Sequence, residues 1–170
     1  MTTRRTILTS AALGTLGSTA FFAIAGPGHD KPHGDKKSAM VKKEQKDWGI
    51  GGDAKNVKRT IEVGMTDQMR FTPDKLDIKQ NETIKFIAVN KGAIGHEFVL
   101  GTKAALDEHA ALMVKFPNME HDAPYMAHVG PGKKEEIIWQ FNKAGDFDFA
   151  CLIAGHYQTG MVGKIKVIAT

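Results

Sequence analysis

The sequence contains a single cysteine, Cys151, among its 170 residues, so no disulfide can form within the chain. In an exported protein, a lone thiol is explained by burial, by pairing with another molecule or by a role as a ligand. Acidic residues are absent from the first 25 positions. Beyond that segment there is no run of about 18 apolar residues, so we expect no membrane span.

The positive charge of the chain is too small to indicate a nucleic-acid partner. The formal net charge is +4. Arg4 and Arg5 lie in an N-terminal segment that we expect to be cleaved, and their loss lowers the net charge to +2. The lysines also lack the interleaved aromatic residues that stack bases. We therefore expect solvated surface lysines, which suit a docking face for acidic protein partners, and no nucleic acid.

Residues 1–25 are typical of an export signal peptide. Arg4 and Arg5 form the charged start, an uncharged stretch follows, and Ala23-Ile24-Ala25 gives a small-x-small cleavage pattern. The stretch TRRTIL at residues 3–8 resembles a twin-arginine signal, which carries folded proteins across a bacterial inner membrane. The alternative is an ordinary secretory signal with two incidental arginines. Either leader predicts a periplasmic protein.

Residues 26–55 are rich in Gly, Lys and Asp and show no hydrophobic periodicity. Such a composition predicts a flexible arm between the leader and the folded domain. His29 and His33 in this arm suit metal capture, although they are also compatible with a solvated linker that carries incidental histidines.

From residue 56 to residue 170 the sequence predicts one all-β domain. Apolar and polar residues alternate, which is the pattern of half-buried strands, in seven segments: 60–65, 75–79, 83–89, 95–100, 135–141, 145–151 and 161–168. Helical spacing interrupts this pattern over residues 103–116, before Pro117, and we expect a helical flap that continues to about Ala127. Seven or eight short strands with one inserted helix predict an antiparallel β-sandwich.

Four side chains of this domain suggest a metal site. Cys151, His156 and Met161 follow one another at intervals of five residues, and His96 lies on an upstream predicted strand. A β-sandwich can bring all four to one end of its sheets. Thiolate, two imidazoles and a weak thioether are the donor set of a mononuclear electron-transfer copper site. Taken singly, each residue suits an ordinary core, but together they predict one copper ion per chain.

Residues 57–170 resemble the cupredoxins of the plastocyanin/azurin type. The stretches MRFTP at residues 69–73 and NETIKF at residues 81–86 are similar to early strands of these proteins, and CLIAGHYQTGM is similar to their ligand loop. The resemblance implies a Greek-key β-sandwich with a type 1 copper site. It also implies a weak axial contact from the Gly95 carbonyl and an electron port at the exposed ring edge of His156.

Two further details refine this resemblance. Glu97 stands where azurin-like proteins usually have Asn, whose side chain helps to tie the ligand loops together. The flap and the ligand loop are most similar to exported cupredoxins associated with bacterial copper tolerance.

A second group of metal-binding residue types lies in the flap and just after it. Its members are thioethers and imidazoles, which suit cuprous ions: Met113, Met119, His121, Met126 and His128. The alternative is that Met113 packs the helix and that the other residues lie incidentally on a polar loop.

Two functions fit the predicted copper site. The first is one-electron transfer between redox proteins of the periplasm, and the second is copper tolerance through binding, buffering or oxidising copper. Copper oxidases and nitrite reductases resemble this fold, but they carry a His beside the cysteine, where this chain has Ala150 and Leu152. The chain also lacks any His-x-His pair, so we expect no enzyme and no catalytic residues. A metal-free β-sandwich is the remaining alternative.

Overall fold

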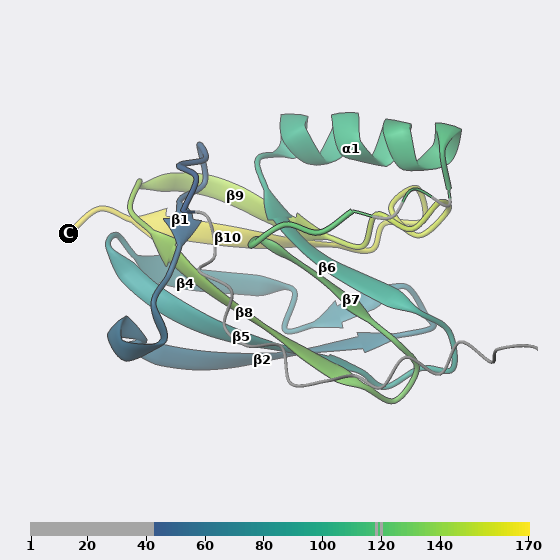
Figure 1. The fold of residues 1–170 in the computed structure, drawn as a ribbon, viewed down its shortest axis with the longest axis horizontal. Coiled ribbons are helices and arrows are strands. Elements are labelled where there is room, and N and C mark those ends of the chain that lie inside the picture. Colours follow the sequence, from purple (N-terminus) through teal and green to yellow (C-terminus); the bar gives the residue numbers. More distant parts are fainter. Residues whose placement is uncertain (1–42, 118, 120) are drawn as a thin grey trace, which may run out of the picture. The chain divides into compact units, whose positions relative to one another are not determined.

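Within residues 43–117, 119 and 121–170, which the computed structural model describes, ten strands form two five-stranded sheets (Figure 1). The two sheets face each other across a shared core, as the predicted β-sandwich requires. The expected export signal, residues 1–25, lies outside the described residues. So do residues 26–42 of the expected arm, which include His29 and His33.

Each sheet is assembled from strands that are far apart in the sequence. The first sheet has the order β1 (Ile50–Gly51), β8 (Lys134–Phe141), β5 (Glu82–Asn90), β2 (Arg59–Thr66) and β3 (Arg70–Thr72). The second has the order β4 (Lys75–Lys79), β10 (Val162–Ile168), β9 (Gly145–Ala150), β6 (His96–Gly101) and β7 (Met126–Val129). A short 3-10 helix, η1 (Ala54–Asn56), and the helix α1 (Lys103–Lys115) complete the described elements.

Aromatic side chains from both sheets fill the core. Phe98 of β6 lies with its ring centroid 5.3 Å from Phe86 of β5, in the opposite sheet, and 5.2 Å from Phe149 of β9. All three rings are fully buried. Burial of each such side chain contributes about 1.5–3 kcal/mol, so this cluster holds β6 and β9 firmly against the other sheet.

The expectation of a purely antiparallel sandwich is wrong for two strand pairs. β2 pairs with β5 in parallel, and β4 pairs with β10 in parallel. The reason lies in the connections, because after β3 the chain crosses to the second sheet as β4 before it returns as β5. A return of this kind allows β5 to run in the same direction as β2.

Helix α1 occupies residues 103–115, nearly the range that the helical spacing predicts. Thr102 caps its start, since the hydroxyl oxygen accepts a hydrogen bond of 3.2 Å from the Ala105 N–H. Leu106, Ala110 and Met113 recur at helical spacing and bury one face of the helix against β6 and β9. Figure 1 shows α1 lying over the second sheet, away from the first.

The segment after α1 does not remain a flap up to Ala127 as expected. β7 begins at Met126 and pairs antiparallel with β6, with Val99 opposite Met126 and His96 opposite Val129. Met126, Ala127 and Val129 are buried while His128 is exposed. A strand of four residues is too short for its alternation to stand out in the sequence.

The folded domain also begins earlier than residue 56. Trp48 is only 9% exposed, and its carbonyl accepts a hydrogen bond of 2.9 Å from the indole N–H of Trp139. Ile50–Gly51 then pair with Trp139 and Gln140 of β8. Residues 43–55 are therefore part of the domain and not of a flexible arm. One buried tryptophan and a two-residue strand produce no periodicity, so the sequence pattern misses them.

Candidate metal centre

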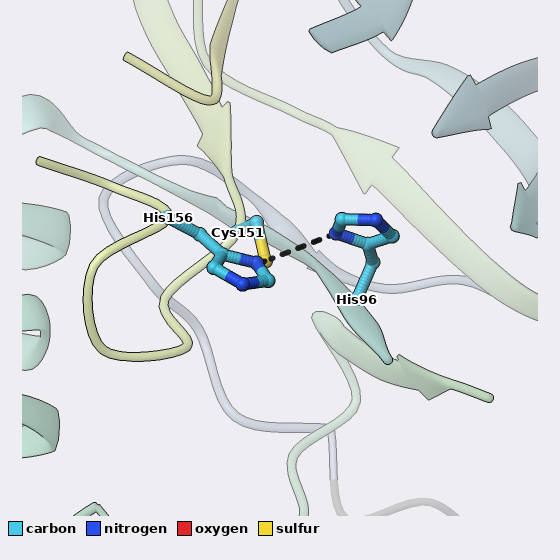
Figure 2. Close-up of side chains that lie close together, drawn as sticks. All are labelled: His96, Cys151 and His156. Atoms are coloured by element: carbon cyan, nitrogen blue, oxygen red, sulfur yellow. Dashed lines mark hydrogen bonds between the residues drawn. The ribbon is translucent and has the colours of Figure 1, made fainter. Parts of the chain in front are cut away.

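The second sheet brings two of the predicted ligands to one of its ends. His96 is the first residue of β6, and Cys151 directly follows β9. These strands are antiparallel neighbours, with Val99 opposite Ala150. The start of β6 and the end of β9 therefore lie together, and the loop from Cys151 to β10 adds His156 to the same place (Figure 2).

The donor atoms of these three residues converge. The Cys151 Sγ lies 3.3 Å from the His156 Nδ1 and 4.0 Å from the His96 Nδ1. All three potential ligand atoms lie within 4.8 Å of one another. Figure 2 shows the two imidazole rings on either side of the sulfur, and their centroids are 5.1 Å apart. A sulfur flanked by two imidazole nitrogens at these distances fits one thiophilic metal ion.

Cys151 is fully buried, and its sulfur accepts a hydrogen bond of 3.2 Å from the Glu97 N–H. Burial raises the pKa of the thiol from 9.0 to about 12, against the opposing effect of the Glu97 and Ile153 N–H groups. Without a cation the residue is therefore a neutral thiol at pH 7. A metal that binds here must displace this proton.

The orientation of His96 is fixed by a carboxylate. The His96 Nε2 lies 3.2 Å from the Asp67 Oδ1, and the side chain of His96 is fully buried. The Asp67 Oδ2 in turn accepts a hydrogen bond of 2.7 Å from the Ala93 N–H, which is the largest of the effects that lower the pKa of Asp67. A proton on Nε2 donated to Asp67 leaves the lone pair on Nδ1, the nitrogen that faces the sulfur.

His156 lies on the loop and is only partly buried. Burial lowers its pKa, and the nearby His96 lowers it further. Both effects favour the neutral imidazole, which is the form that can bind a metal. Gly155 and Gly160, with φ of 92° and 88°, allow the loop to turn on either side of His156 in the left-handed region that favours glycine.

Met161 is fully buried at the end of the same loop. Its carbonyl accepts a hydrogen bond of 3.1 Å from the Cys151 N–H, and its own N–H donates one of 3.1 Å to the His156 carbonyl. These bonds join the backbones of the three loop residues predicted as ligands. Gly95 precedes His96 at the start of β6, and its predicted axial contact remains a prediction.

Two residues that position the site were missed by the sequence interpretation. Asp67 follows β2, and no sequence pattern marks it as a partner of His96. Asn90 is buried, and its amide donates to the carbonyls of Ile94 (2.7 Å) and Val129 (2.9 Å) while its oxygen accepts from the Gly92 N–H (2.8 Å). Asn90 thus holds the loop before His96 against β7. Its place in the turn Asn90-Lys91-Gly92 was the available signal.

Glu97, the departure from the azurin pattern, is buried and paired. Its Oε1 lies 3.1 Å from the His128 Nδ1, and the His128 Nε2 lies 2.9 Å from the His121 carbonyl oxygen. Both nitrogens of His128 face oxygen acceptors, so the ring donates both hydrogen bonds only when it carries both protons. A contact between the Glu97 carboxylate of β6 and the His128 ring of β7 therefore takes the position of the usual amide.

The structure separates the second group of predicted metal-binding residues. Met113 and Met126 belong to a buried apolar cluster beneath α1. Met119 and His121 instead line an open pocket beside α1, and His128 is occupied by Glu97 and the His121 carbonyl. His109 of α1, which the sequence interpretation did not include, lies against His121 with a ring-centroid distance of 4.6 Å. Burial, followed by the nearby His121 and His128, lowers the pKa of His109.

Comparison with known proteins agrees with the geometry. The family model for copper binding proteins of the plastocyanin/azurin family matches residues 57–168. The copper-resistant cuproprotein CopI of Rubrivivax gelatinosus is 45% identical over 162 residues, covering 95% of this chain and 97% of that protein. CopI of Pseudomonas aeruginosa is 34% identical, covering 71% and 82%.

Solved structures show the same fold. Reduced auracyanin of Roseiflexus castenholzii is similar with a TM-score of 0.57 at 19% identity, over 66% of this chain and 98% of that one. Auracyanin B is similar with a TM-score of 0.57 at 18% identity, over 73% and 96%. At these identities the similarity supports the sandwich fold.

Proposed function

Since this chain belongs to the plastocyanin/azurin family of copper-binding proteins, the cupredoxins, we propose that His96, Cys151, His156 and Met161 hold one copper ion as a type 1 site. The observation that carries this proposal is the convergence of the two imidazoles and the buried thiol within 4.8 Å. The buried Met161 would supply the weak thioether, and the carbonyl of Gly95, which precedes His96, would supply a distant contact.

The function that this site supports best is one-electron transfer. Copper bound there supplies a one-electron redox couple. The chain's own part is to keep the ligands still: Asp67 fixes the His96 ring, the Glu97 N–H holds the sulfur, and the aromatic core fixes β6 and β9. His156, the partly exposed ligand, offers the edge through which a partner redox protein exchanges the electron.

The second candidate function is copper tolerance, and a specific observation favours it. The relatives at 45% and 34% identity are named copper-resistant cuproproteins. In this role the same site would bind, buffer or oxidise copper. Electron transfer, copper binding and copper buffering are functions of a carrier or binding protein, and none of them requires a catalytic residue.

Three measurements test these proposals: an optical copper titration, the rate of electron self-exchange and the copper tolerance of a deletion strain. Addition of cupric ion to the mature chain should produce an intense thiolate-to-copper absorption that is absent in Cys151→Ser. A colourless wild-type protein would contradict the type 1 site. Fast electron self-exchange together with normal copper tolerance of a deletion strain supports the carrier. Copper sensitivity that is rescued by the wild type but not by Cys151→Ser supports the tolerance role.

We also propose that the protein works in the periplasm after export. The support is the leader pattern of residues 1–25, with its paired arginines. In the part of the chain that the structure describes, no helix has the length and apolar character needed to cross a membrane. Fractionation with and without replacement of Arg4 and Arg5 by lysine tests the twin-arginine route.

A further inference from the structure

A pocket of about 310 Å³ lies between α1, β6 and the segment that leads into β7. Its walls are mainly apolar and include Leu106 and Leu112 of α1 and the rings of Trp48 and Tyr125. Three side chains of metal-binding type also line it: His109, Met119 and His121. None of them takes part in the centre built from His96, Cys151 and His156.

His121, which lines this pocket, has one paired and one unpaired ring nitrogen. Its Nδ1 lies 3.0 Å from the Met119 carbonyl oxygen, so this nitrogen carries the proton and donates it. The other nitrogen, Nε2, is buried and has no hydrogen-bond partner among the described residues. A ring whose Nδ1–H is bound to a backbone carbonyl, with Nε2 left free, is the arrangement that metal-ligating histidines adopt. A buried polar atom without a partner otherwise costs free energy.

His109 comes close to His121 from the opposite wall. Their ring centroids are 4.6 Å apart and the ring planes are inclined by 58°. Imidazole–metal bonds are about 2 Å long, so two nitrogens that share one ion lie at most about 4 Å apart. A ring-centroid distance of 4.6 Å is comparable with that spacing. Met119, whose carbonyl orients His121, also lines the pocket and is 39% exposed.

We propose that His109, His121 and Met119 form a second copper site, selective for the cuprous ion and distinct from the type 1 centre. The soft thioether favours Cu(I), imidazole is also a copper ligand, and mainly apolar walls suit an ion that needs few ligands and little water. Harder ions such as Mg²⁺ require several oxygen ligands, and Glu108 is the only carboxylate among the described residues lining the pocket.

The other residues of the flap provide controls within the same molecule. Met113 and Met126 are 4% and 5% exposed and pack in the apolar cluster beneath α1. His128 has both nitrogens engaged, by Glu97 and by the His121 carbonyl. The proposal therefore assigns the cuprous ion to Met119 and excludes the two neighbouring buried methionines.

The test is an anaerobic Cu(I) titration of the full mature chain labelled with ¹³C at its methionine methyl groups. We expect two separate responses, a shift of the Met161 methyl signal from the type 1 site and a shift of the Met119 signal from the pocket. The signals of Met113 and Met126 should stay in place. Because each site has its own methionine, failure of the type 1 proposal and failure of the pocket proposal give different spectra.

Variants make the result specific to the pocket. His121→Ala should abolish the Met119 response and leave the Met161 response intact, and His109→Ala should weaken Cu(I) binding at Met119 at least about tenfold. The matched control Met126→Leu, a volume-conserving change, should bind at Met119 like the wild type. A Met119 signal that does not move with excess Cu(I), or that moves equally in His121→Ala, would overturn the proposal.

Discussion

The two proposed metal-binding regions of this molecule are built from similar residue types but in different ways. At the sandwich end, the donors come from two adjacent strands and one loop whose backbone is closed by its own hydrogen bonds. Beside α1, they come from a helix and an irregular segment around an open pocket. In both regions one histidine is oriented by an oxygen acceptor, Asp67 for His96 and the Met119 carbonyl for His121. The difference indicates a rigid site for one ion and a more accessible site for another.

The two regions are joined through Glu97. Its N–H donates to the Cys151 sulfur, while its carboxylate pairs with His128. His128 in turn contacts the carbonyl of His121. One buried residue of β6 therefore touches the sulfur of the first region and, through one imidazole, the backbone of the second. Variants confined to one region test whether the two regions nevertheless act separately.

The largest expected effect is that of Cys151→Ser. Removing the thiolate should abolish the intense absorption and weaken cupric binding at the sandwich end more than about 100-fold, beyond the loss typical of an outer-shell change. The Met119 response to Cu(I) should persist. Optical and methyl NMR titrations measure the two sites side by side, and simultaneous loss of both would show that they are one unit.

The next largest effect is the release of a proton when copper binds. Burial raises the pKa of the Cys151 thiol to about 12, so copper binding at pH 7 should release one proton that Cys151→Ser does not release. Calorimetry in buffers with different ionisation enthalpies measures the number of protons released. Equal proton release by the two proteins would contradict a neutral thiol at the site.

The same pKa sets a stability prediction for the metal-free protein. The pKa of the Cys151 thiol is about 12 in the folded state, above its ordinary value of 9.0. The contribution of the buried neutral thiol to the free energy of unfolding is therefore complete below pH 9. It should be lost as the pH rises from 9 to about 12, because the unfolded thiol ionises first. Denaturant unfolding gives the free energy of unfolding of the metal-free wild type and of Cys151→Ser at each pH. The slopes of these free energies against pH should therefore differ only between pH 9 and about 12.

A smaller effect is expected from Asp67→Asn. The carboxylate makes the His96 ring a stronger donor and stabilises the oxidised ion, so its neutralisation should raise the reduction potential. A tenfold change in the relative stability of the two oxidation states corresponds to about 59 mV, and we expect a rise on the order of 30–60 mV. Voltammetry measures it, with the exposed Asp77→Asn of β4 as the matched control. An unchanged or lower potential would contradict this role.

The smallest effect is expected where α1 meets the ligand loop. The Tyr157 hydroxyl donates a hydrogen bond of 2.6 Å to Asp107 of α1, and burial, together with this bond, raises the pKa of Tyr157. Tyr157→Phe should lower Tm by roughly 2–4 °C through loss of one partly exposed hydrogen bond. The absorption spectrum should stay unchanged, and a shifted spectrum would show that α1 helps to set the copper geometry.

The sequence predicts those parts of the structure that depend on regular patterns. Period-two alternation identified the long strands, and helical spacing with a terminal proline identified α1 almost to the residue. The residues of the CLIAGHYQTGM loop could be selected because their types and intervals match a known ligand set. These signals are local, and each lies within a short stretch of chain.

The features that the sequence did not reveal depend on contacts between distant segments. Asp67 is 29 residues from His96, and the Trp48 carbonyl is 91 residues from its partner Trp139. The parallel pairs β2–β5 and β4–β10 follow from chain crossings that no local pattern records. His109 lies within the predicted helix, where nothing in the sequence pattern distinguishes it, and only its proximity to His121 suggests a metal site.

The most direct test of the central claim is anomalous diffraction at the copper edge from crystals of the copper-loaded mature chain. The account predicts the strongest peak between the Cys151 Sγ and the Nδ1 atoms of His96 and His156, with the Met161 thioether facing it. A strongest peak elsewhere, with the thiol and the two imidazoles left empty, would contradict it.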